Sequence, residues 1–108
     1  MTVLVESKQV KVTKALREFA TKQANKLNKL GKKISKVTVY LETITKKSND
    51  PQANKVTFTL EVPGKNVVVR KHAVDMYVAI VDAAHAAVRQ LRKKVERQHA
   101  LRRRTASA

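Results

Sequence analysis

Basic side chains recur at helical spacing in the first third of the chain. Lys22, Lys26 and Lys29 fall within a sector of about 60° if the segment is an α-helix that turns by about 100° per residue. The stretch between Glu18 and Glu42 contains six lysines and no acidic residue. Because ammonium groups bind phosphate oxygens, such an unneutralised stripe favours binding to a polyanion.

The last third of the chain repeats this pattern. Arg89, Lys93 and Arg97 recur every four residues, and Arg92 flanks them. From Arg89 to the end of the chain there are eight basic residues and one acid. Like charges four residues apart destabilise a helix by a few tenths of a kcal/mol per pair, so the stripe has a cost that a bound polyanion would offset.

A solvated helix surface is the ordinary explanation of a run of charges, but the total charge favours a polyanionic partner. The 108 residues contain 24 Lys and Arg against 8 Asp and Glu, which gives a formal net charge of +16 and a pI near 10.6. Nucleic acid is the usual partner of such a chain. An anionic membrane is the alternative, but the last basic segment has Ala and Val where a membrane-surface helix usually carries Trp, Phe or Leu.

Residues suited to catalysis or metal binding do not form a recognisable pattern. His72, His85 and His99 are too far apart in sequence to resemble the close pairs that chelate metals. There is no cysteine, and Gly31 and Gly64 are the two glycines, too few for a glycine-rich phosphate loop. We therefore predict no enzyme activity, no cofactor, no metal and no small-molecule substrate.

Aromatic residues make up 4% of the chain. The hydrophobic patterns place Phe19, Phe58 and Tyr77 in the core, which leaves Tyr40 facing outward. Stacking on single-stranded bases needs exposed aromatic rings. We therefore expect recognition of shape and phosphate, with Lys and Arg making most of the contacts.

The elements that must position these residues begin with a short strand at Thr2–Glu6. Thr13 is suited to cap the N-terminus of a helix, and apolar residues at helical spacing predict that helix over Lys14–Leu30. Gly31 is suited to the left-handed position that ends a helix.

From Lys36 the hydrophobic period changes to two, which predicts strands. A polar loop at residues 46–51 interrupts the alternation, which returns around Phe58. Pro63 and Gly64 predict a type II turn with a positive φ at the glycine, followed by a strand at Val67–Val69. The short connections predict antiparallel neighbours, and Asp75 is the expected cap of a long last helix.

The predicted order is therefore β-α-β-β-β-α. Two helices on one face of a four-stranded sheet form an α+β sandwich of two layers. We predict one domain over residues 1–100 and a basic flexible tail over residues 101–108. With no run of about 20 apolar residues and no secretory signal at the N-terminus, the sequence predicts a cytoplasmic protein.

Several short motifs follow one another along the chain: Ser7-Lys8-Gln9, Val12-Thr13-x-Ala15-Leu16-Arg17, Lys26-Leu27-x-Lys29, Asp75-Met76-Tyr77-x-Ala79-Ile80 and Arg89-Gln90-Leu91. Together they resemble one family, the ribosome hibernation-promoting factors, which include the ribosome-associated inhibitor proteins of bacteria and plastids. The resemblance covers about Thr2 to Arg97, in the same element order. Its most specific part is the motif at residues 75–80 followed by Arg89-Gln90-Leu91.

The resemblance implies a domain similar to double-stranded RNA-binding domains. It implies that this domain occupies the decoding channel of the small ribosomal subunit, where it blocks mRNA and tRNA and inhibits translation during stress and stationary phase. The RNA-binding positions that match the family are Lys26, Lys29, Arg89 and Lys93. The helical-face argument alone adds three further residues to the predicted RNA-binding set: Lys22, Arg92 and Arg97.

The matched range fits both the short members and the N-terminal domain of long members. The expected partner is the small subunit and its rRNA within the whole ribosome, in the bacterial cytosol rather than a plastid, with the isolated domain a monomer. Two other functions remain open at this point. One is a general RNA- or DNA-binding protein of the RNA-chaperone or nucleoid type, and the other is a constitutive ribosomal protein.

Overall fold

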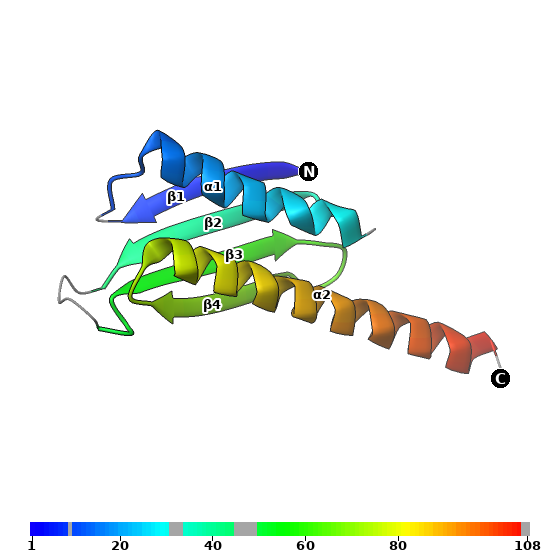
Figure 1. The fold of residues 1–108 in the computed structure, drawn as a ribbon. Coiled ribbons are helices and arrows are strands. Elements are labelled where there is room, and N and C mark those ends of the chain that lie inside the picture. Colours follow the sequence, from blue (N-terminus) through cyan, green and yellow to red (C-terminus); the bar gives the residue numbers. More distant parts are fainter. Residues whose placement is uncertain (9, 31–33, 45–49, 107–108) are drawn as a thin grey trace.

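A computed structural model describes residues 1–8, 10–30, 34–44 and 50–106, without the side chains of residues 30 and 95–106. The element order confirms the predicted α+β fold (Figure 1). Gly31 and most of the predicted loop at residues 46–51 lie outside the described residues. The elements are β1 (Thr2–Lys8), α1 (Lys14–Asn25), the 3₁₀ helix η1 (Lys26–Leu30), β2 (Lys36–Thr43), β3 (Asn54–Glu61), β4 (Val67–Ala73) and α2 (Met76–Ala106).

The four strands form one sheet in the order β1-β2-β3-β4. β1 pairs with β2 in parallel, because the intervening helical segment returns the chain to the end of the sheet at which β1 begins. The other two pairs are antiparallel, as predicted. β1 and β4 therefore run in the same direction. Since α1 follows β1 and α2 follows β4, the two helices also run in the same direction, side by side on one face of the sheet (Figure 1).

The core lies between the sheet and this helical layer. Val39 of β2 and Phe58 of β3 are paired in register, and both are fully buried. The helices contribute small buried residues such as Ala20 and Ala83, which let their backbones approach the sheet closely. Alternation along the strands leaves the opposite face of the sheet uncovered by any described helix.

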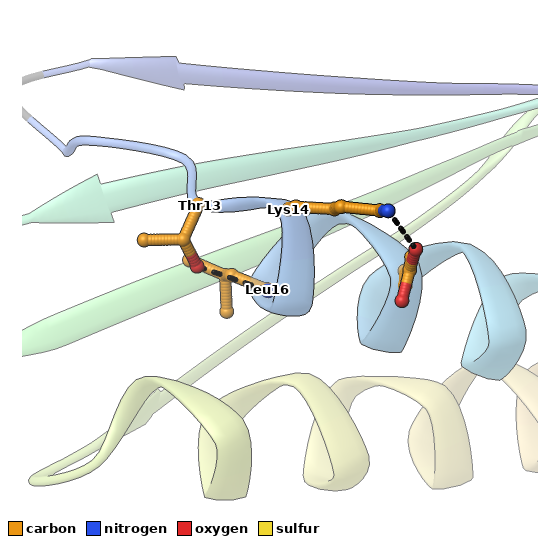
Figure 2. A network of polar contacts seen from close by, with 4 residues as sticks. Thr13, Lys14 and Leu16 are labelled. Atoms are coloured by element: carbon orange, nitrogen blue, oxygen red, sulfur yellow. Dashed lines mark hydrogen bonds and ion pairs between the residues drawn. The ribbon is translucent and has the colours of Figure 1, made fainter.

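Both predicted helix caps are confirmed. The Thr13 hydroxyl oxygen accepts a hydrogen bond from the Leu16 amide at 3.1 Å (Figure 2). The Asp75 carboxylate accepts one from the Tyr77 amide at 2.7 Å, so α2 begins at Met76. Each bond satisfies an amide that has no acceptor within its own helix. Figure 2 also shows the exposed ion pair of Lys14 with Glu18, which contributes little because solvent screens it.

Thr13→Ala is expected to lower the free energy of unfolding by about 1 kcal/mol, because the Leu16 amide loses its acceptor at the start of α1. Denaturant unfolding of the parent and the variant measures this difference. Thr13→Ser keeps a hydroxyl group and serves as the control, with a much smaller loss expected. Equal losses in the two variants would mean that the Thr13 methyl group, and not the cap, stabilises this end.

The prediction for the first helix is wrong in its second half. The sequence predicted one α-helix over Lys14–Leu30, but the α-helix ends at Asn25 and a 3₁₀ helix continues to Leu30. Tightening into 3₁₀ geometry is common where a helix ends. Leu27 is fully buried, so this last turn still packs against the core.

β4 continues four residues beyond the predicted strand and ends at Ala73, because its pairing with β3 extends to Asn54. The preceding turn confirms the positive φ predicted for Gly64, which has a φ of 88°. The Lys94 side chain donates a hydrogen bond to the Lys65 carbonyl oxygen in the same turn. α2 therefore holds the β3–β4 connection against the helical layer.

The prediction that Tyr77 lies in the core is wrong, because 41% of this residue is exposed. Tyr77 is offset by about 60° from the buried Ile80 around α2, at the margin of the apolar face. Its ring meets Phe19 of α1 edge to face, with 5.0 Å between ring centroids and an angle of 62° between planes. Phe19 is itself half-buried, so the pair closes the outer rim of the contact between the helices.

The last helix is longer than the sheet that supports it. Its 31 residues span about 46 Å, whereas the strands span about 25 Å. α2 therefore projects past the sheet toward the C-terminus (Figure 1). Its helical backbone continues to Ala106, within the segment predicted as a flexible tail.

Candidate nucleic-acid interface

The three predicted lysines of the first stripe are all exposed. Lys22 lies in the last turn of α1, and Lys26 and Lys29 lie in η1. A 3₁₀ helix has three residues per turn, so Lys26 and Lys29 lie on the same side of η1. The rotation of about 100° per residue that places the three lysines in one sector therefore applies only as far as Asn25. All three lysines nevertheless face solvent.

The predicted basic residues of α2 are distributed over two sides of the helix. Arg89, Arg92 and Lys93 are exposed, and the intervening Leu91 is fully buried. Arg92 and Lys93 diverge by about 100° around the helix axis. Arg92 lies about 60° from Tyr77, which contacts α1, so Arg92 is on the side of α2 that faces α1.

Arg89 and Lys93 instead line a groove between α2 and β4. The groove has a volume of about 440 Å³ and is open to solvent. Two basic residues of β4, Arg70 and Lys71, also line it. Arg97 lies one turn beyond Lys93 in the helical backbone, but its side chain lies outside the described residues, so its role stays a prediction.

Sequence reasoning missed Arg70 and Lys71. The predicted strand ended at Val69, directly before these two residues. The hydrophobic alternation does not extend over them, because Arg70, Lys71 and His72 are three consecutive polar residues. Only the pairing of β4 with β3 brings these residues beside α2.

A further basic residue of α2, next to the second stripe but not part of it, has a structural role. Lys94 is half-buried, and its ammonium group donates to the Lys65 carbonyl oxygen. This hydrogen bond directs the side chain toward the β3–β4 turn. Lys94 is therefore less available to a polyanion than the exposed Arg92 and Lys93.

The two basic stripes extend toward the same end of the helical layer. Glu18, Asp75 and Asp82 lie near the N-terminal ends of the two helices. Lys22 and Arg89 begin the basic stripes, which extend toward the C-terminal ends. Because the helices run in the same direction (Figure 1), Glu18, Asp75 and Asp82 lie toward one end of the layer and the stripes extend toward the other. Glu96 follows within the second stripe, but its side chain lies outside the described residues.

The uncovered face of the sheet is closer to neutral. Alternation along β1, β2 and β3 places one acid of each strand on this face: Glu6, Glu42 and Glu61. Lys8 of β1 and Lys55 of β3 face the same way, and both are paired in register with Glu42. The positive potential is therefore strongest over the helical layer and the groove.

His85 is exposed on the outer side of α2, as its position in the helical pattern predicts. Within the part of the chain that the structure describes, no three His, Asp or Glu side chains gather in a way that could hold a metal ion. No described helix is both long and apolar enough to cross a membrane. These surfaces can bind an extended anion through charge and hydrogen bonds.

Comparison with known proteins identifies the relatives of this chain. Residues 3–99 match the family model described as sigma 54 modulation protein / S30EA ribosomal protein. A ribosome hibernation promotion factor of Deinococcus radiodurans is 33% identical over 89 residues, which cover 82% of this chain and 46% of the relative. The chain thus spans about half the length of that relative.

Two further comparisons cover most of both partners. A ribosome hibernation promoting factor of Pseudomonas putida is 32% identical over 101 residues, covering 94% of this chain and 93% of the relative. The structure of a ribosomal subunit interface protein from Coxiella burnetii has a TM-score of 0.73 at 22% identity, covering 89% of this chain and 99% of that one. This last likeness concerns the fold.

Proposed function

Because the chain belongs to the sigma 54 modulation protein / S30EA ribosomal protein family, we propose that it is a ribosome hibernation factor. It binds the rRNA of the small ribosomal subunit in the decoding channel, excludes mRNA and tRNA, and inhibits translation. The family consists of non-enzymatic ribosome-binding proteins. The protein acts as a monomer in the bacterial cytosol, as part of the response to stress and stationary phase.

The observation that carries this proposal is the gathering of exposed basic side chains toward one end of the helical layer. Lys22, Lys26 and Lys29 on one helical segment and Arg89, Arg92 and Lys93 on the other are exposed toward the same end of the layer. Glu96 is the one acid within the second stripe, whereas Glu18, Asp75 and Asp82 lie toward the opposite end. An rRNA backbone at the basic end gains attraction without facing those three carboxylates.

Recognition depends on phosphates and shape more than on bases. Tyr40 lies on the uncovered sheet face and is half-buried. Tyr77 is more exposed, but its ring is held by Phe19 and it lies near the acidic residues Asp75 and Asp82. Neither ring lies within a basic stripe, so stacking on unpaired bases contributes little.

We expect the protein to sediment with purified small subunits, to be displaced by tRNA, and to bind large subunits weakly. If it neutralises about six to ten phosphates, its affinity should fall by about 10³- to 10⁵-fold between roughly 50 and 200 mM salt. Sedimentation with each subunit in graded salt measures the subunit preference and the salt dependence, and added tRNA measures the displacement. The physical reason is release of counterions from the rRNA backbone.

Two outcomes would contradict the proposal. Association with the large subunit alone would exclude a decoding-channel site, and affinity that hardly changes with salt would exclude the phosphate mechanism. Unrelated duplex RNA of equal length is the control ligand. Equal affinity for that RNA and for the small subunit would favour a general RNA-binding protein instead.

A further inference from the structure

The groove between β4 and α2 differs from the exposed stripes because it is concave. Its volume of about 440 Å³ lies within the usual range for ligand sites, although it is more open than an enclosed pocket. One wall is the outer strand of the sheet, and the other is the middle of α2, including Ala86. The small Ala86 side chain leaves space between the two walls.

Four cationic side chains from the two walls line this groove. Arg70 and Lys71 come from β4, and Arg89 and Lys93 come from α2. No acidic residue lines the groove, and within the described residues none of the four forms an ion pair. Four positive charges lining one groove repel each other, and an anion in the groove would relieve this repulsion.

The position of β4 at the edge of the sheet explains how adjacent strand residues can both contribute. Successive side chains of a strand point to opposite faces. Lys71 therefore lies on the helical side and Arg70 on the uncovered side, and both border the groove because no further described strand lies beyond β4. An edge strand also presents backbone amides that can donate to an anion.

The groove is separate from the lysines of the first stripe. Arg92 lies on the side of α2 that faces α1, whereas Arg89 and Lys93 face β4. η1, which carries Lys26 and Lys29, packs against α2. Cationic side chains thus lie along both sides of α2. An RNA backbone bound on one side leaves the cationic side chains of the other side free to bind a second RNA segment.

We propose that this groove is a second phosphate-binding site, which takes backbone phosphates of an RNA segment different from the one that contacts the α1 and η1 lysines. This assignment rests on the proposed function in naming RNA as the polyanion. Free nucleotides share the phosphate chemistry. RNA backbone is the better fit, because no aromatic side chain lines the groove to stack on the base of a free nucleotide.

The test removes the two charges contributed by β4. We expect Arg70→Gln/Lys71→Gln to weaken binding to small subunits by roughly 10- to 100-fold near 100 mM salt. The slope of log affinity against log salt should fall by about 1.4 to 1.8, the value for two lost phosphate contacts. Lys8→Gln/Lys55→Gln is the matched control, because it removes the same charge from the uncovered sheet face and should leave the slope nearly unchanged.

A short RNA duplex is measured with the same variants so that the two proposals can fail separately. If the parent does not bind small subunits, but the Arg70/Lys71 variant loses affinity and salt slope for the duplex relative to the control, the proposed function fails and the groove stands. If this variant matches the control with both ligands, the groove assignment is overturned. Thermal melts confirm that both variants fold.

Binding of ATP is measured to distinguish RNA backbone from free nucleotides as the ligand of the groove. We expect ATP to bind the parent no more tightly than millimolar and to compete with RNA only at such concentrations. Micromolar binding of ATP that disappears in Arg70→Gln/Lys71→Gln would identify a nucleotide site and overturn the assignment to RNA backbone.

Discussion

Arg89→Glu/Lys93→Glu is expected to weaken binding to the small ribosomal subunit by at least about 100-fold, the largest loss for any pair of surface residues. Hydrogen bonds to charged groups contribute about 1.5–3 kcal/mol each, so two lost contacts alone correspond to roughly 10²- to 10⁴-fold. The new carboxylates add repulsion from phosphate. Pelleting with small subunits at fixed salt measures the loss.

The fold of this variant should be intact. Arg89 and Lys93 are both exposed, and surface substitutions usually change the free energy of unfolding by about 0.5 kcal/mol or less. Lys11→Glu/Lys14→Glu is the matched control, because it reverses two exposed charges at the acidic end of the helical layer. We expect this control to bind much more tightly than the Arg89/Lys93 variant. Similar losses in the two would show that net charge, and not the position of the α2 residues, governs binding.

The Arg89/Lys93 and Arg70/Lys71 substitutions should not be additive. All four residues line one groove, and neighbouring residues that contact the same ligand usually couple. Once Arg89 and Lys93 are reversed, phosphate should already be absent from the groove. The additional loss from changing Arg70 and Lys71 should then be smaller than in the parent.

Phe58→Ala is expected to have the largest effect on stability, with a loss of about 3–5 kcal/mol in the free energy of unfolding. Phe58 is fully buried in the centre of the sheet and pairs with Val39, so removing its ring leaves a cavity. Such a loss is a large share of the roughly 5–15 kcal/mol that stabilises a typical domain. Denaturant unfolding and thermal melts measure it.

Tyr77→Ala is the comparison for this prediction. Because Tyr77 is 41% exposed and packs against Phe19 at the rim, we expect a loss of about 1–2 kcal/mol. Ribosome binding should then persist at temperatures well below the melting point. If Tyr77→Ala destabilised the domain as much as Phe58→Ala does, Tyr77 would contribute to stability like a core residue despite its exposure at the rim.

Local signals in the sequence predicted the elements well and their ends less well. Thr13 and Asp75 were identified as caps because a cap bonds to an amide two or three residues away, which is a local property. The end of α1 was missed, since helical periodicity does not distinguish an α-helix from a 3₁₀ turn that buries the same Leu27. β4 was predicted too short, because its length depends on pairing with β3.

The candidate site was predicted in part for the same reason. Lys22, Lys26, Lys29, Arg89, Arg92 and Lys93 belong to helical segments, and for those segments the hydrophobic pattern indicates which side chains face solvent; all six are exposed. Their role in binding RNA stays a prediction. Arg70 and Lys71 could not be associated with Arg89 from spacing, because strand-to-helix contacts across the sheet edge have no local signature.

The sequence by itself determined the basic character of the protein, its α+β element order, its two helix caps and the positive φ of Gly64. These properties follow from composition, periodicity and contacts between near neighbours. The tertiary structure decided where the charge gathers. Parallel pairing of β1 with β2 makes α1 and α2 run in the same direction, which brings the two basic stripes to the same end of the helical layer. Placement of β4 at the sheet edge, beside α2, forms the groove, because only packing brings residues so distant in sequence together.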